Sequence, residues 1–197
     1  MGAYLQAAVE GDLDGAVIER LAQHVGVTIG TIYGGQGKEF LRKRIRNYNR
    51  AARLGPWIVL LDLDHEFTCA PDLVTAWLSQ PEPLMRLRVA VREVESWLIA
   101  DRERIASFLA VSKSLVPIDP ENLPDPKAAV INLARRSRRR EIREDLAPRP
   151  GSGRKIGPAY VSRLMEYVRD AKSGWRPNVA AAKAPSLKKC LSSLASL

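Results

Sequence analysis

Hydrophobic and polar positions in the first half of the chain follow two alternating patterns. Continuous or alternating apolar and β-branched runs predict strands over 3–9, 25–33, 57–61 and 85–91. Between these runs, apolar residues recur every three to four positions, which predicts helices after Asp12, over 38–53, from Pro71 and from Val94. Because strands and helices take turns, the pattern predicts an α/β fold with a mostly parallel sheet of about four strands flanked by helices.

The second half of the chain shows helical spacing alone. Four prolines between Pro117 and Pro126 indicate an extended connection. Helices are predicted after it over 127–139, 156–171 and 186–195. The Arg- and Gly-rich segment 140–155 is expected to separate the first two of these helices. We therefore expect an α/β domain over 1–110 and a basic, mainly helical extension over 111–197 that packs on it.

The composition is that of a globular protein able to bury a core. Hydrophobic residues make up 46% of the 197 residues, and no apolar run approaches the roughly 18 residues of a membrane span. The start of the chain lacks the basic and apolar regions of a secretion signal. Cys69 and Cys190 stand far apart, and with two histidines they form no zinc motif. We expect a soluble cytoplasmic protein with no membrane partner.

The positive charge lies in the second half of the chain. Residues 1–110 carry 13 Lys and Arg against 14 Asp and Glu, whereas residues 111–197 carry 18 against 8. This asymmetry favours a polyanionic partner such as nucleic acid; the alternative is a solubilising surface balanced by nearby acids. The candidate nucleic-acid-binding residues are Lys38, Arg135, Arg136, Arg138, Arg139, Arg140, Arg154 and Lys155.

Acidic residues follow three of the four predicted strands. Glu10 follows the first, Asp62 and Asp64 the third, and Glu93 and Glu95 the fourth. In an open α/β sheet the carboxyl ends of parallel strands meet at one edge, so these side chains should converge. Carboxylates brought together repel one another, and a divalent cation relieves the repulsion. The alternative is that these acids are helix caps and surface charges.

Two motifs in this order resemble a known domain. Val9-Glu10-Gly11-x-x-Asp14, followed by an apolar strand ending in Asp62-x-Asp64, resembles the Toprim domain of topoisomerases, bacterial primases, RNA maturases and OLD-family nucleases. Within that group the chain is similar to a Toprim-like family of unknown function that is often encoded beside an ATPase. The segments that support the narrower resemblance are 34–38, 91–101, 153–158 and 185–187.

The resemblance implies a set of roles for the acidic residues. Glu10, Asp62 and Asp64 would be catalytic and would hold one or two Mg²⁺ or Mn²⁺ ions. Asp14 would add a ligand to a second metal, and Glu95 would complete the site. Two such ions stabilise the attacking and leaving oxygens of an in-line displacement, so no covalent nucleophile is needed. Glu66, Glu93 and Asp101 could also belong to this site, but each could equally be a helix cap or an ion-pair partner.

The sequence therefore predicts an enzyme, a magnesium-dependent nuclease or related phosphodiesterase acting on DNA or RNA. It could serve as the effector of an ATPase-containing phage-defence system, an expectation that rests on the resemblance alone. The alternative is a catalytically latent regulatory or toxin-like subunit that works by binding the partner ATPase. Nucleotidyl transfer, as in primases, ranks last because the zinc and helicase-binding modules of primases are absent.

Overall fold

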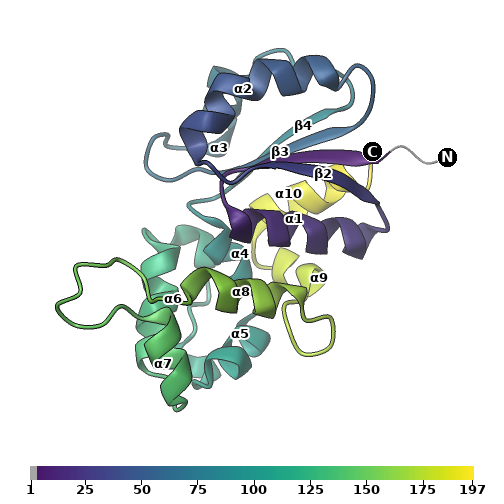
Figure 1. Ribbon diagram of the computed structural model, residues 1–197. Helices are drawn as coiled ribbons and strands as arrows, with labels where there is room; N and C mark the ends of the chain where they lie inside the picture. Colours follow the sequence, from purple (N-terminus) through teal and green to yellow (C-terminus); the bar gives the residue numbers. More distant parts are fainter. Residues whose placement is uncertain (1–3) are drawn as a thin grey trace. The chain divides into compact units, whose positions relative to one another are not determined.

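The computed structural model describes residues 4–197, which form two compact units (Figure 1). The first unit contains the described residues up to Val94 together with Ser186–Leu197, and the second contains Glu95–Pro185. Ala3, where the first predicted strand begins, lies outside the described residues. The chain thus leaves the first unit once and returns to it at its end.

The first unit is built on a four-stranded sheet in which all neighbouring strands are parallel. The strands are β1 (Leu5–Val9), β2 (Ile29–Gly34), β3 (Trp57–Asp62) and β4 (Met85–Ala90), and their spatial order is β2-β1-β3-β4. The apolar run of β3 is buried from Trp57 to Leu61, because a central parallel strand is covered on both faces. The predicted α/β fold with a parallel sheet is confirmed.

Helices cover both faces of this sheet (Figure 1). α1 (Asp12–Val25) and α10 (Pro185–Leu194) lie on one face, and α2 (Lys38–Ala51) and α3 (Ala70–Trp77) lie on the other. Beneath α2 and α3 the largest apolar side chains of both helices pack against β3 and β4 in one continuous core. Each helix therefore turns one apolar stripe to the sheet and its polar residues outward.

The strand order changes direction at β1. α1 leads from β1 to β2 on one side of it, whereas β3 lies on its other side. In open α/β sheets such a switch leaves a crevice beyond the carboxyl ends of the two strands, here β1 and β3. Glu10 follows β1 directly and Asp62 is the last residue of β3. The topology thus brings these two acids to the switch point.

The second unit consists of helices and turns, with no strand among residues 95–185. Its elements are α4 (Val94–Ala100, which starts at the end of the first unit), α5 (Arg102–Leu109), α6 (Pro126–Arg135), α7 (Arg140–Leu146), α8 (Tyr160–Arg169), α9 (Pro177–Ala181) and the 3-10 turns η1 (Lys113–Leu115) and η2 (Pro120–Asn122). Trp97, Tyr160 and Trp175 are almost fully buried at its centre.

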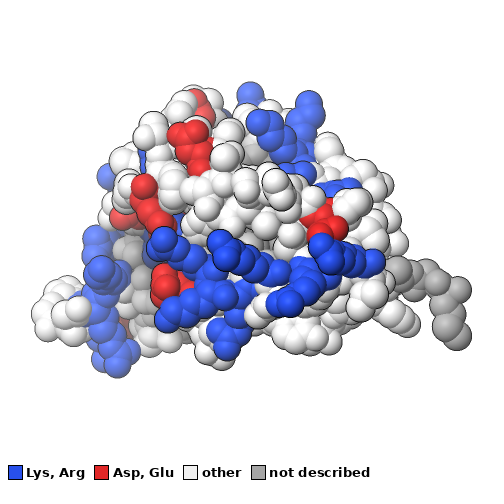
Figure 2. Space-filling model, turned by 90° about the horizontal axis from the view of Figure 1, so that it is seen from above, with Lys and Arg blue, Asp and Glu red and all other residues white. Residues whose placement is uncertain are grey.

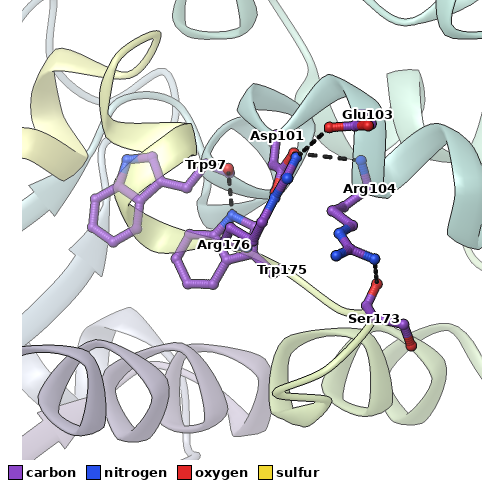
Figure 3. A network of polar contacts seen from close by, with 7 residues as sticks. All are labelled: Trp97, Asp101, Glu103, Arg104, Ser173, Trp175 and Arg176. Atoms are coloured by element: carbon purple, nitrogen blue, oxygen red, sulfur yellow. Dashed lines mark hydrogen bonds and ion pairs between the residues drawn. The ribbon is translucent and has the colours of Figure 1, made fainter.

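A buried polar network ties two distant segments of this unit together (Figure 3). The indole Nε1 of Trp175 donates to the carbonyl oxygen of Trp97 at 3.0 Å. Next to it, Arg176 donates from Nε and Nη2 to the fully buried carboxylate of Asp101 at 2.8 and 2.7 Å. Asp101 also caps α5 by accepting from the backbone N–H of Arg104. Asp101 is thus both a cap and an ion-pair partner.

Two element predictions differ from the structure. The sequence predicts an irregular segment over 140–155, but α7 occupies its first seven residues. Ile142 and Leu146 are the buried residues of α7, too few for a periodic pattern to appear in the sequence. The strand predicted over 25–33 begins later, at Ile29, because α1 continues to Val25 and Gly26 ends it in the left-handed conformation.

The domain boundary predicted near residue 110 stays a prediction, although the compact units divide at another place, between Val94 and Glu95. The last helix, predicted as part of the extension, belongs with the sheet in the first unit. Across residues 4–197, no helix combines the length and the apolar character that crossing a membrane would require.

Candidate functional site

The side chain of Glu10 reaches from the end of β1 to the end of β3. Its Oε1 accepts a hydrogen bond from the backbone N–H of Asp62 at 2.9 Å, although the two residues lie 52 positions apart. The register explains this contact, because Val9 pairs with Leu60 in the sheet and the residues that follow both strands emerge side by side. The structure therefore brings Glu10 and Asp62 together at the switch point.

The carboxylate of Asp62 is held in turn by the start of α4. Its Oδ1 accepts from the backbone N–H of Val94 at 3.0 Å. A helix N-terminus presents backbone N–H groups that lack helical partners and favours negative charge nearby. A backbone N–H group therefore helps to orient each of the carboxylates of Glu10 and Asp62.

Asp64 lies in the loop after β3, where the backbone is unusual. Asp64 and Arg92 both adopt left-handed conformations, with φ of 50° and 61°. The two residues hold each other, since the N–H of Asp64 donates to the carbonyl of Arg92 at 2.9 Å and Nη1 of Arg92 donates to the carbonyl of Asp64 at 2.7 Å. Non-glycine residues in this region are strained and cluster at functional sites.

A glycine loop delivers Lys38 to the same edge. Gly34 lies so close to β1 that a Cβ atom there would stand 1.9 Å from the carbonyl oxygen of Val9, so only glycine fits. The loop continues along the carboxyl end of β1. There the N–H of Gly35 donates to the carbonyl oxygen of Val9, and the N–H of Gly37 donates to that of Glu10. α2 then begins at Lys38, which places this side chain beside the acidic residues.

The ammonium group of Lys38 is surrounded by oxygen atoms. Nζ donates to the backbone carbonyl of Asp62 at 2.8 Å and to that of Leu63 at 3.4 Å. It also pairs with the carboxylates of Asp64 at 2.9 Å and Glu66 at 3.4 Å, while its own side chain is 17% exposed. Lys38 therefore neutralises part of the acidic edge. The sequence alone offered a phosphate contact or a solvated lysine, and did not show this role.

Asp14 and Glu95 are anchored separately. Asp14 is buried in the first turn of α1, where its Oδ2 accepts from the N–H of Gly11 at 2.9 Å. Glu95 is buried in the second unit, where the hydroxyl of Tyr160 donates to its Oε1 at 3.1 Å and Nζ of Lys127 lies 3.8 Å from the same atom. Their assignment as metal ligands stays a prediction.

The donor atoms at this edge suit a hard cation. Carboxylate and carbonyl oxygens are the ligands that Mg²⁺ prefers, and here such oxygens already surround one cationic group, the ammonium of Lys38. Within the described range 4–197, no three His, Cys, Asp or Glu side chains stand close enough together to form a metal site. The assignment of Glu10, Asp62 and Asp64 as magnesium ligands therefore stays a prediction, which rests on the chemistry of their oxygens.

The candidate arginines of the second unit lie on exposed surfaces. Arg135 and Arg154 line a cavity of about 590 Å³ together with Arg143 and Arg149. Arg140 is paired with Glu144 at 2.7 Å, and hydrogen bonding to this carboxylate raises the pKa of Arg140. The other exposed candidates of the second unit that do not line this cavity are Arg136, Arg138, Arg139 and Lys155. The structure therefore gathers part of the predicted basic set around one hollow.

Sequence reasoning missed two groups that shape the edge. Arg92 and the backbone N–H of Val94 both follow β4 and hold Asp64 and Asp62 respectively. A hydrogen bond from a main-chain N–H leaves no residue-type signal, because every residue except proline supplies one. The left-handed backbone of Arg92 has no signal either, since glycine or asparagine would mark such a position and arginine does not.

Comparisons with known proteins add no relative to this picture. The chain matches no protein-family model, no curated protein and no solved structure.

Proposed function

We propose that this protein hydrolyses phosphodiester bonds of nucleic acid, with magnesium held at the carboxyl edge of its sheet by Glu10, Asp62 and Asp64. The observation that carries the proposal is the hydrogen bond between the Glu10 carboxylate and the backbone N–H of Asp62. It supports the proposal because two acidic residues from remote parts of the chain meet at the switch point, where α/β proteins bind their ligands.

The charge at this edge supports a role for a divalent cation. Glu10, Asp62, Asp64 and Glu66 stand at or just after the ends of β1 and β3. Lys38 pairs with Asp64 and Glu66, and Arg92 donates to the backbone of Asp64. A phosphodiester carries its own negative charge, so it would be repelled unless further positive charge were present. Magnesium held there would supply that charge and would act as a Lewis acid for in-line displacement at phosphorus.

The protein's own residues contribute orientation and electrostatics. Backbone N–H groups fix the planes of the Glu10 and Asp62 carboxylates, so neither has to reorient when a cation binds. Lys38 holds Asp64 in place and adds a positive charge to this edge, which would favour a bound phosphate. The paired strained residues Asp64 and Arg92 hold the loop after β3 in one shape.

The test replaces the two acids by their amides. In Glu10→Gln and Asp62→Asn the amide oxygen can still accept from Asp62 N–H and Val94 N–H, so the fold should persist. Both lose the negative charge that holds a divalent cation, and we expect magnesium-dependent cleavage to fall by more than about 100-fold. Cleavage is measured on labelled duplex DNA, single-stranded DNA and RNA, with circular dichroism to confirm folding.

Glu141→Gln is the matched control, because Glu141 is an exposed acid of the second unit and its loss changes the net charge equally. We expect this variant to cleave like the unmodified protein. Equal cleavage by all four proteins would contradict the site assignment. Absence of cleavage by the unmodified protein on every substrate, with Mg²⁺ or Mn²⁺, would contradict hydrolysis by the isolated chain.

One observation favours the alternative of a catalytically latent subunit controlled by a partner such as an ATPase. The ammonium of Lys38 already occupies the oxygen cluster, which lowers the affinity of that cluster for another cation. In a latent protein, binding of the partner would have to move Lys38 away. Activity that appears in the isolated chain only after Lys38 is replaced would support this second function.

A further inference from the structure

The exposed face of α2 is strongly basic. Residues 38–51 contain six Lys and Arg and one acidic residue, Glu39. Counted over residues 1–110, this excess disappears, because acidic residues elsewhere in that half cancel it. Folding therefore separates the charges and creates a basic surface that the net charge of the segment conceals.

The helix periodicity puts these charges on one side. Leu41, Ile45 and Tyr48 are buried beneath α2, three and four residues apart. The side facing away carries exposed basic residues at the same spacing, namely Arg42, Lys43, Arg46 and Arg50. Side chains four residues apart lie on one face, about 6 Å apart along the axis, so Arg42, Arg46 and Arg50 form a row. Figure 2, which looks onto the side where α2 lies in Figure 1, shows Lys and Arg as a band.

Neighbouring acids do little to neutralise this row. Glu39 lies 3.9 Å from Arg42 and 4.0 Å from Lys43, and all three side chains are at least 60% exposed. Ion pairs of this length in solvent contribute little, so the arginines keep their capacity to bind an anion. Arg44 differs, because its guanidinium stacks on the ring of Phe40 at 3.6 Å and covers that ring.

The row starts at the candidate site. Lys38, the first residue of α2, is bonded to the carbonyl of Asp62 and the carboxylate of Asp64, and the helix runs on from there. Both features belong to the first unit, so one rigid helix links them. The aromatic residues of α2 are covered, Phe40 by Arg44 and Tyr48 by burial, so this face offers charge without stacking.

We propose that the Arg42–Arg46–Arg50 face of α2 binds the phosphodiester backbone of the nucleic acid and leads it to the acidic edge. This inference rests on the proposed function for its substrate class. Contacts to the backbone depend on charge and carry no base sequence, so the face should bind nucleic acids of different sequence with similar affinity. The affinity should fall steeply as salt rises, because each phosphate contact releases counterions.

The test removes the row and leaves the site intact. Arg42→Gln, Arg46→Gln and Arg50→Gln are combined and compared with Lys183→Gln, Lys188→Gln and Lys189→Gln, three exposed lysines whose loss lowers the net charge by the same amount. Binding of a fluorescent duplex DNA and of the matching RNA is followed by anisotropy over a range of salt, in EDTA so that no cleavage occurs.

We expect the α2 variant to bind at least about tenfold more weakly near 0.1 M salt, and its salt dependence to lose roughly 0.9 units of slope per contact removed. The lysine variant should keep the slope of the unmodified protein. An unchanged slope in the α2 variant would overturn the proposal. The proposal would also be overturned if the α2 variant lost binding to anionic lipid vesicles but kept its binding to nucleic acid. EDTA removes divalent metal, so binding is measured without cleavage. The binding result therefore holds even if the protein proves not to cleave nucleic acid.

Discussion

At the scale of single residues, the acidic edge shows how far residue type and position lead. Glu10 and Asp62 could be placed together from the sequence because each follows a predicted strand, and parallel strands end at one edge. The environment of Lys38 could not be predicted, because it depends on Gly34 approaching Val9 and on backbone bonds of the glycine loop. Such contacts are specified by backbone geometry, which residue names do not reveal.

Lys38 provides a prediction at this scale. Lys38→Met keeps most of the unbranched side chain and removes the ammonium, which leaves Asp64 and Glu66 without that counterion. Without divalent cations we expect a lower melting temperature than that of the unmodified protein. Magnesium should raise the melting temperature of the variant more than that of the unmodified protein, because a ligand that binds the native state more tightly stabilises it more.

Differential scanning fluorimetry with and without millimolar magnesium makes this comparison. Lys43→Met is the matched control, since Lys43 lies on the same helix with its side chain 69% exposed. The control should respond to magnesium as the unmodified protein does. If magnesium shifts Lys38→Met and Lys43→Met equally, the Lys38 ammonium does not compete with a cation at this edge.

At the scale of elements, the apolar pattern of a helix or strand can be recognised in the sequence when that element buries many residues. β3 could be predicted because its apolar run is continuous, whereas α7 buries Ile142 and Leu146 alone and escaped prediction. The basic face of α2 shows a related effect in charge. The sequence itself predicts a basic amphipathic helix over 38–53, whereas the net charge counted over residues 1–110 averages this excess away.

The junction between α4 and α5 carries a prediction of its own. Asp101→Asn removes the charge that pairs with Arg176 and keeps a side-chain oxygen to cap α5. We expect the free energy of unfolding to fall by roughly 2–4 kcal/mol, since a buried carboxylate is lost while Arg176 stays in place. Denaturant titration measures the change.

Glu103→Gln tests whether burial decides the size of this effect. Glu103 binds the same guanidinium at 2.7 Å, but its side chain is 66% exposed, and hydrogen bonding to Arg176 lowers its pKa. Solvent screens that pair, so we expect little loss of stability. If Asp101→Asn and Glu103→Gln lose similar free energy of unfolding, burial does not make Asp101 the dominant partner of Arg176.

At the scale of the whole molecule, the chain order conceals how the parts associate. The last helix, α10, is separated from β4 by the whole second unit, yet it belongs to the first. Arg88 Nε donates to Ser193 Oγ at 2.7 Å, and the N–H of Val91 donates to Ser186 Oγ at 3.3 Å. Serine is most often found on protein surfaces, so nothing in the sequence marked Ser186 and the buried Ser193 as hydrogen-bond partners of the sheet.

Docking of α10 gives the last prediction, with Cys190 as its probe. Cys190 is fully buried, and burial raises the pKa of its thiol to about 12. In a Cys69→Ser background, N-ethylmaleimide should therefore label Cys190 slowly while the protein is native, because reaction needs an exposed thiolate.

Ser193→Ala takes an acceptor from the half-buried Arg88, so α10 should detach more often and labelling should be about five- to tenfold faster. Mass spectrometry measures the rates, and Ser192→Ala, which alters an exposed serine of the same helix, should leave the rate unchanged. Equal rates in the two serine variants would mean that the bond from Arg88 does not hold α10.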